Sequence, residues 1–303
     1  MGRYIPGLLK RKEQYDLYLK ELENKPSAFR NDKYQVYFKS KNDASIADMS
    51  KEDEKAYKSG KGGELTIRKN RYGQELPISM LSVASSSRFC YLSLRDSDLS
   101  AFDIHNIIVK RRFEERLPIL EGGTPPHMDA YCETDKEVCF FECKCHEQFD
   151  GHPIVLSESY FNKGLIVDDV FKDQKPINYR EAVKKDGEMV KYPIYSSTVF
   201  DGIDNPRFDI KQLLTHLMGI KKKMEKVNDK KARLIYFYFI PDKVRKNSQI
   251  EEIIKLLIDE AEIVFNYIKT YEKNISLELY IQHSDTVRTA TKDNVRRIYP
   301  KDE

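Results

Sequence analysis

The stretch from Gly123 to Glu147 decides the fold: G-T-P-P-H-M-D-A-Y-C-E-T-D-K-E-V-C-F-F-E-C-K-C-H-E. Two mostly apolar runs, Met128 to Cys132 and Val138 to Cys145, flank a polar segment from Glu133 to Glu137. Runs of this length on either side of a short polar segment are typical of a β-hairpin. The stretch therefore predicts two antiparallel strands joined by a tight turn.

The turn determines which side chains face each other. A turn that is symmetric about Asp135 and Lys136 pairs Asp129 with Glu142. Opposite side chains in an antiparallel pair lie roughly 5 Å apart at Cβ, so the two carboxylates meet. Lys144 shares their face because strand side chains alternate with period two. The other face of the hairpin is apolar and carries Met128, Ala130, Phe141 and Cys143.

The cluster of two acids and a lysine predicts a metal site. Like charges that face each other destabilise a hairpin unless a cation compensates them. Mg²⁺ prefers carboxylate oxygens and water, and it binds substrate phosphates. An ammonium beside such a site can orient the attacking water or stabilise charge on a phosphate. The cluster thus indicates phosphodiester hydrolysis. The alternative is that Asp129 is a turn residue and that Glu142 and Lys144 are solvated, as charged residues commonly are.

The same residues resemble a known superfamily. Pro126 to Asp129, followed by Glu142-Cys143-Lys144, is similar to the motif of the PD-(D/E)xK nucleases, in their restriction-endonuclease-like branch. The similarity extends to Ser85-Ser86-Ser87, to Glu147 and to Lys211-Gln212-Leu213-Leu214. This resemblance implies an α/β fold with a restriction-endonuclease-like core, in which helices flank a central mixed β-sheet.

The resemblance covers roughly Pro77 to Gln282 and so divides the chain. We expect a catalytic domain over residues 77–303, preceded over residues 1–76 by an N-terminal extension with a helix from Tyr4 to Leu22 and a flexible basic loop. The resemblance also implies an endodeoxyribonuclease that depends on Mg²⁺, with Mn²⁺ as a substitute. The implied catalytic residues are Asp129, Glu142, Lys144, Gln212 and Glu147, and the implied metal-binding residues are Asp129, Glu142 and Cys143.

Four of the acidic and amide residues have competing explanations. Glu147 can equally be a solvated residue. Gln212 follows Asp209 by three residues, which also fits a reciprocal helix cap. An additional acid, Glu114 or Glu115, could reach the metal, although a surface position is the simpler interpretation of both.

DNA is the expected partner. The net charge is only +3, with 33% charged residues, so contacts to DNA must come from local patches. The densest patch is Lys221, Lys222, Lys223 and Lys226, with a solvated helix end as the alternative. A catalytically silent DNA-binding or assembly module on the same scaffold is the alternative function, and RNA is a third substrate to test. A homodimer is one way to cut both strands of a duplex.

The number of cysteines and the hydropathy of the sequence indicate in which cellular compartment the protein is expected. Five cysteines, an odd number, fit a reducing compartment better than a disulfide framework. No apolar run approaches the roughly 20 residues that span a bilayer, so we expect a cytoplasmic protein without membrane contact. Zinc binding is the alternative to buried free thiols for Cys132, Cys139, Cys143 and Cys145. The usual C-x-x-C spacing is missing from the sequence, and free cysteine often packs as a small apolar residue.

The spacing of apolar residues and the positions of glycine, proline and other turn-forming residues predict the remaining elements. These are a flexible loop over Ser40–Gly63, one helix over Pro77–Leu94, a strand within Ile107–Leu120, an irregular region over Phe149–Pro206, a helix over Arg207–Lys226, a buried strand over Arg233–Ile240, a helix from Ser248 to Tyr271 opened by a capping box with Glu251, and an outer strand over Ile275–Gln282.

Overall fold

The computed structural model describes most of the chain. The described residues are 28–30, 36–59, 63–69, 72–96, 98–118, 125–149, 151–156, 160–161, 165–183, 189–203, 206–227, 229–284 and 287–300. The helix expected over Tyr4–Leu22 lies outside them. Among the residues that are described, no helix is both long enough and apolar enough to cross a membrane.

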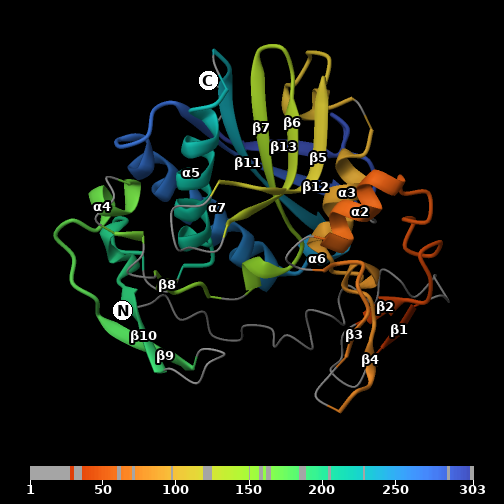
Figure 1. The fold of residues 1–303 in the computed structure, drawn as a ribbon, viewed down its shortest axis with the longest axis horizontal. Coiled ribbons are helices and arrows are strands. Elements are labelled where there is room, and N and C mark those ends of the chain that lie inside the picture. The colour runs from red at the N-terminus through yellow and green to blue at the C-terminus, as the bar shows by residue number, and fades with distance from the viewer. Residues whose placement is uncertain are drawn as a thin grey trace.

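A six-stranded mixed β-sheet forms the centre of the protein, and helices cover both of its faces (Figure 1). Strands β5, β6 and β7 are antiparallel neighbours, β7, β11 and β12 run parallel, and β13 is antiparallel to β12. The prediction of an α/β fold with a central mixed sheet flanked by helices is confirmed. The strands are β5 Lys110–Arg116, β6 His127–Glu133, β7 Glu137–Lys144, β11 Lys231–Pro241, β12 Ile275–Ser284 and β13 Val295–Tyr299.

Helices make the connections that parallel strands require. Helix α5 (Ile210–Met224) lies between β7 and β11 in the chain, and α6 (Asp242–Arg245) and α7 (Ser248–Lys269) lie between β11 and β12. One apolar core joins α5 and α7 to the sheet, and a second core joins α2 (Lys51–Ser59) and α3 (Ser86–Leu94) to its other face. Strand β11 is therefore buried on both faces, as its continuous apolar run predicts.

Three smaller sheets, the short helix α4 and several 3₁₀ turns complete the part of the fold that the structure describes. One of the sheets is antiparallel in the order β8-β10-β9, and two are strand pairs. The prediction of an irregular region over Phe149–Pro206 is therefore wrong. Pro193 inside β10 hides the strand pattern, since proline is unusual within a sheet. The elements are β1 Ala28–Arg30, β2 Val36–Phe38, β3 Arg68–Lys69, β4 Glu75–Leu76, β8 Ile154–Val155, β9 Asn178–Val183, β10 Met189–Tyr195, α4 Ile166–Val170, and the 3₁₀ turns η1 Ser79–Leu81, η2 Ser100–Phe102, η3 Glu147–Phe149 and η5 Ser197–Val199.

Polar caps explain where the helices differ from the predictions. The expected loop over Ser40–Gly63 contains α2, because the Asp53 main-chain N–H donates to Ser50 Oγ at 3.0 Å and starts a helix. The helix expected over Pro77–Leu94 is divided into η1 and α3, because Ser85 is the N-cap of α3 and accepts from the Arg88 N–H. Helix α7 is capped by Asn247 rather than by a Ser248–Glu251 box.

The last strands also differ from the prediction. Strand β12 was expected to be an outer strand, but β13 pairs with its free side and forms the edge of the sheet. β13 is short and carries two adjacent arginines, Arg296 and Arg297, so its sequence has little strand character. The apolar content of β12, which is buried almost throughout, reflects its inner position.

The predicted hairpin is present with the predicted register. Ala130 faces Phe141, Glu133 faces Val138, and the Thr134 N–H donates to the Glu137 carbonyl at 2.9 Å. The expectation for one apolar residue is wrong. Ala130, Phe141 and Cys143 belong to the core under α3, but Met128 belongs to the core under α5. The pairing of β5 with β6 is interrupted at Glu114 and Asp129, and Glu114 has a positive φ of 52°. Beyond this interruption, the side chains point to the face opposite to the one that strict alternation along the strand predicts.

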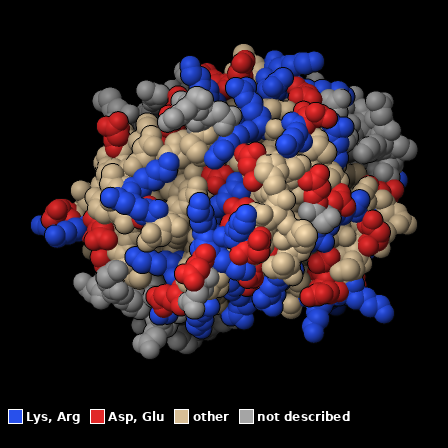
Figure 2. Space-filling view, turned by 90° about the horizontal axis from the view of Figure 1, so that it is seen from above, with Lys and Arg blue, Asp and Glu red and all other residues tan. Residues whose placement is uncertain are grey.

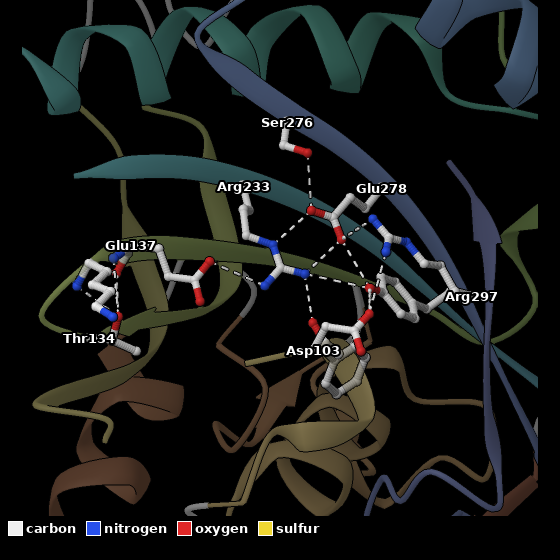
Figure 3. A network of polar contacts seen from close by, with 10 residues as sticks. Asp103, Thr134, Glu137, Arg233, Ser276, Glu278 and Arg297 are labelled. Atoms are coloured by element: carbon white, nitrogen blue, oxygen red, sulfur yellow. Dashed lines mark hydrogen bonds and ion pairs between the residues drawn. The ribbon is translucent and has the colours of Figure 1, made fainter. Parts of the chain in front are cut away.

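A buried ion-pair network holds the strands together where β7, β11 and β12 begin (Figure 3). The Arg233 guanidinium donates to both oxygens of Glu278 at 2.7 Å and to the Phe102 carbonyl at 2.6 Å. It also contacts Glu137 at 3.3 Å, so one side chain links three strands and η2. The Tyr280 hydroxyl donates to Glu278 at 3.0 Å. Burial opposes the charge of Arg233, but Glu278 outweighs it and raises the pKa of the guanidinium.

Substitution of Glu278 by Gln should destabilise the fold strongly. The change removes the acid that binds the buried Arg233 guanidinium through both oxygens and leaves Glu137 at 3.3 Å as its opposite charge; removing one partner of a buried pair costs about 3–5 kcal/mol in typical proteins. We expect a fall of about 3 kcal/mol in the free energy of unfolding, measured by urea denaturation. The control is Glu181→Gln, which removes the partner of Lys191 in an exposed 3.2 Å pair and should cost less than about 1 kcal/mol. Equal effects of the two substitutions would contradict the assigned role of Glu278.

Candidate functional site

The candidate site lies where strands β6 and β7 separate. Their pairing ends at Ala130 and Phe141, and beyond that point the Cys143 N–H donates to the Asp129 carboxylate, Oδ2, at 2.7 Å. The side chain of Asp129 thus replaces the main-chain acceptor that a continued ladder would supply. The predicted neighbour Glu142 is close enough for its charge to act on Asp129 across this gap.

Glu142 and Lys144 form a buried ion pair on the α5 face of β7. The Lys144 ammonium lies 2.7 Å from Glu142 Oε1, and the two residues are only 9% and 4% exposed. The alternative of a solvated strand face is wrong for these two residues. Asp129 is partly buried beside them. The structure therefore brings together the two acids and the amine that the hairpin register predicts.

Helix α5 supplies two further groups to Glu142. The Gln212 Nε2 amide donates to Glu142 Oε1 at 2.7 Å, while the Gln212 main-chain N–H donates to the N-cap Asp209 at 2.8 Å. The main chain of Gln212 thus serves the cap and its side chain faces the site. One turn later, His216 Nε2 lies 3.7 Å from Glu142 Oε2. The sequence analysis missed His216, although its position four residues after Gln212 places it on the same face of the helix.

A glycine lets α5 approach the sheet closely enough for these contacts. A Cβ atom on Gly219 would lie 2.7 Å from Leu117 Cβ and 3.0 Å from Pro126 Cγ. Any larger residue would push α5 away from the chain that leads from β5 to β6. Gly219 follows Gln212 and His216 on the same helix face. Its close approach to Leu117 and Pro126 therefore determines how far the Gln212 and His216 side chains lie from β7.

Glu147 organises the chain just after Lys144. Its Oε2 accepts from the main-chain N–H groups of Cys145 at 2.9 Å and His146 at 3.0 Å. Burial opposes the charge of Glu147, but Lys144, His146 and these hydrogen bonds outweigh burial and lower the pKa of the carboxyl to about 2. Glu147 is therefore an ionised, ordered residue rather than a solvated one.

Unlike Glu147, Asp129 and Glu142 prefer their neutral forms more than a carboxyl group in water does. Burial, followed by the charges of Glu142 and Glu114, holds the pKa of Asp129 well above its ordinary value. Burial also raises the pKa of Glu142, although Lys144 opposes this. For Lys144, burial is outweighed by the surrounding acids, chiefly Glu142, so the pKa of its ammonium rises and the charge persists. The site thus gathers more negative charge than its lysine compensates.

The two additional acids separate in the structure. Glu114 lies toward the site, and burial with the charges of Glu64 and Glu142 raises its pKa to about 7. Glu115 is buried instead between Arg112, at 3.5 Å, and Lys223. The expectation of a surface position is wrong for Glu115 and for Glu114, which is half-buried. Glu114 is therefore the additional acid that interacts electrostatically with Asp129 and Glu142.

The basic patch on α5 is largely paired with acids. Lys222 lies 2.7 Å from Glu225, Lys221 lies 3.7 Å from Glu272, and Lys223 contacts Glu115. Figure 2 shows one face of the molecule on which Lys and Arg side chains gather with Asp and Glu side chains between them. Lys223 lies about 16 Å along the helix from Gln212, given 1.5 Å per residue over eleven residues. The positive charge of the lysine cluster is, because of these pairs, weaker than the sequence indicates.

The cysteine side chains lie on the other side of the sheet. Cys132 faces Cys139 as the register predicts, and Cys143 and Cys145 join them in the core under α3. All five cysteines are buried, and none of them forms a disulfide. The thiol of Cys143 therefore cannot reach a cation beside Glu142, so only its main chain could serve the metal position expected of this residue.

The oxygen atoms at the gap are of the kind that Mg²⁺ prefers. Residues of β7 with odd numbers direct their main-chain groups toward β6: Glu137 accepts from Thr134, and Cys143 donates to Asp129. Since both main-chain groups of a strand residue point to the same side, the Cys143 carbonyl faces the Asp129 side as well. Two carboxylates and one carbonyl, with water, fit the ligand set of Mg²⁺. Within the described residues, no three His, Cys, Asp or Glu side chains are grouped so that they could hold a metal ion.

Comparison of the chain with protein-family models, with curated proteins and with solved structures finds no match.

The charge of Glu147 should make a pH-dependent contribution to stability. Its folded pKa of about 2 lies below the ordinary 4.5, so the contribution is complete above pH 4.5 and disappears as the pH falls toward 2. We expect Glu147→Gln to lower the free energy of unfolding at pH 7 by about 1–3 kcal/mol. Urea denaturation in EDTA at pH 7, 5 and 3 should show this difference shrinking between pH 5 and pH 3.

A matched control separates this effect from any loss of surface charge. Glu225→Gln breaks the exposed pair with Lys222 and should cost at most about 1 kcal/mol. A difference between wild type and Glu147→Gln that stays constant from pH 7 to pH 3 would contradict the assigned electrostatic role.

Proposed function

We propose that the protein is a Mg²⁺-dependent endodeoxyribonuclease with the restriction-endonuclease-like core of the PD-(D/E)xK superfamily. The observation that carries this proposal is the buried contact of Lys144 with Glu142, at 2.7 Å, beside Asp129 at the gap between β6 and β7. Buried ionisable groups with shifted pKa values are more frequent at functional sites than elsewhere.

The order of the elements supports the same proposal. Helix α3 precedes the three antiparallel strands β5, β6 and β7, and α5 and β11 follow them. Helix, strands, helix and strand is the order that the superfamily resemblance implies. The Asp129 and Glu142 positions fall on the two central hairpin strands, and Gln212 falls on the helix that follows.

Each residue has a distinct role in the proposed reaction. Asp129, Glu142 and the main chain of Cys143 would hold the Mg²⁺ ion. Mg²⁺ supplies charge stabilisation on the scissile phosphate and lowers the pKa of a coordinated water. Lys144 presents its ammonium to the attacking water or to the charge that develops on the phosphate. Gln212 fixes the Glu142 carboxylate, and Glu147 fixes the turn that follows Lys144.

A silent scaffold is the second candidate function, and one observation favours it. Lys144 and Gln212 both engage Glu142 Oε1, so the carboxylate is already satisfied on that oxygen without a cation. A DNA-binding or assembly module would bind DNA equally well in EDTA and in Mg²⁺. A nuclease of the proposed type would bind Mn²⁺ at the site and cut.

Removal of Lys144 should abolish DNA cleavage. We expect purified wild-type protein to cut plasmid DNA with Mg²⁺ or Mn²⁺, and Lys144→Ala to cut at least about 100-fold more slowly, since groups that stabilise developing charge contribute about 10²–10³-fold. Duplex DNA and RNA offered in competition would identify the preferred substrate.

The control for this experiment is Lys191→Ala, which removes an exposed lysine on β10 and should cut like wild type. Thermal unfolding of both variants checks that they are folded. Equal cleavage by wild type and Lys144→Ala, or no cleavage by wild type with either ion, would exclude the assigned catalytic role.

A further inference from the structure

Tyr236 stands beside Glu142 on the neighbouring strand. In the parallel pairing of β7 and β11, Tyr236 is the register partner of Glu142, so both side chains project to the α5 face. Tyr236 is fully buried. Burial, then the charges of Glu142 and Asp209, hold the pKa of its hydroxyl well above the ordinary value. The hydroxyl therefore keeps its proton and is available as a hydrogen-bond donor.

Three buried polar atoms near Glu142 lack hydrogen-bond partners among the described residues. They are the Tyr236 hydroxyl oxygen, Gln212 Oε1 and His216 Nδ1. A hydroxyl can donate and an amide oxygen can only accept, so the two atoms complement each other. Buried polar groups are nearly always hydrogen-bonded in native proteins. The Tyr236 hydroxyl thus supplies a donor and Gln212 Oε1 an acceptor on the side of the sheet that carries Glu142.

The orientation of the Gln212 amide matters for Glu142. The two ends of a carboxamide have almost the same shape, so only hydrogen bonds determine which end faces a neighbour. Nε2 donates to Glu142 Oε1, whereas the flipped amide would set its oxygen against the carboxylate. A donor to Gln212 Oε1 therefore selects the orientation that supports Glu142.

His216 adds no competing charge to this arrangement. Burial and the nearby Lys144 lower the pKa of His216 to about 3, so its ring is neutral. The ring lies 6.4 Å from the Tyr236 ring, between centroids, and its Nε2 is 3.7 Å from Glu142 Oε2. Tyr236, His216 and Gln212 thus surround Glu142 with neutral polar groups from β11 and α5.

We propose that Tyr236 is a positioning residue for Glu142. Its hydroxyl donates to Gln212 Oε1 through one bound water, and so holds the Gln212 amide in the orientation that donates to Glu142. Tyr236 does not touch the substrate. The inference rests on the proposed function in one respect, namely that the orientation of Glu142 serves cation binding.

The test compares full-length wild type with Tyr236→Phe. The substitution removes one oxygen and keeps the ring that packs on Phe208 and Phe265. We expect Mn²⁺ to bind about 10-fold more weakly in an electron paramagnetic resonance titration, because residues that orient metal ligands typically contribute 10- to 100-fold to affinity. Crystal structures of both proteins without metal should show Gln212 turned toward Glu142 only in wild type.

The matched control is Tyr299→Phe. This hydroxyl donates to Asn266 Oδ1 at 2.8 Å, away from the site, so its loss should lower the unfolding temperature and leave the Mn²⁺ affinity unchanged. Equal Mn²⁺ affinity in wild type and Tyr236→Phe, with the same Gln212 orientation in both crystals, would overturn the inference. If wild type itself binds no Mn²⁺, the proposed function fails, and the Gln212 orientation alone decides the role of Tyr236.

Discussion

The candidate site depends on how strand β7 satisfies its main chain after β6 leaves it. A strand buried on both faces cannot leave an N–H group without an acceptor, because such a group costs free energy comparable to a lost hydrogen bond. The Asp129 carboxylate accepts from the Cys143 N–H and closes the end of the ladder. The same contact brings one carboxylate next to another, since Glu142 precedes Cys143. The end of the hairpin and the acidic cluster are therefore one structural feature.

This feature is costly for the fold alone. Burial raises the pKa values of Asp129 and Glu142, which means that the folded protein disfavours their charges, and a buried ion pair such as Glu142 with Lys144 is seldom a net source of stability. Well-packed apolar residues of similar volume would serve the core at least as well. A cluster of this kind is understandable where its charges act on a ligand, and the oxygens at the gap fit a hard cation.

The hairpin and its acidic face could be predicted from the sequence because they depend on local rules. Strand alternation and the position of the turn are sufficient to place Asp129, Glu142 and Lys144 together. The position of Met128 in the core under α5, rather than under α3, was not predictable, since it follows from the positive φ of Glu114 in another strand. His216 carried a weak signal, its spacing from Gln212. Tyr236 carried none, because its position depends on the register of β11 against β7, which only the packed sheet determines.

Strand β11 links the two polar clusters of the sheet. It carries Arg233 in the network with Glu278 and, three residues later, Tyr236 beside Glu142. Three residues of strand span about 10 Å, so the network and the site are separate but share one backbone that is buried throughout. Each of the three guanidinium nitrogens of Arg233 has a hydrogen-bond partner, whereas the Glu142 cluster has unequal charges and buried polar atoms without partners among the described residues. Arg233 therefore anchors the registers of β7, β11 and β12, and those registers determine how closely Tyr236 and Gln212 can hold Glu142.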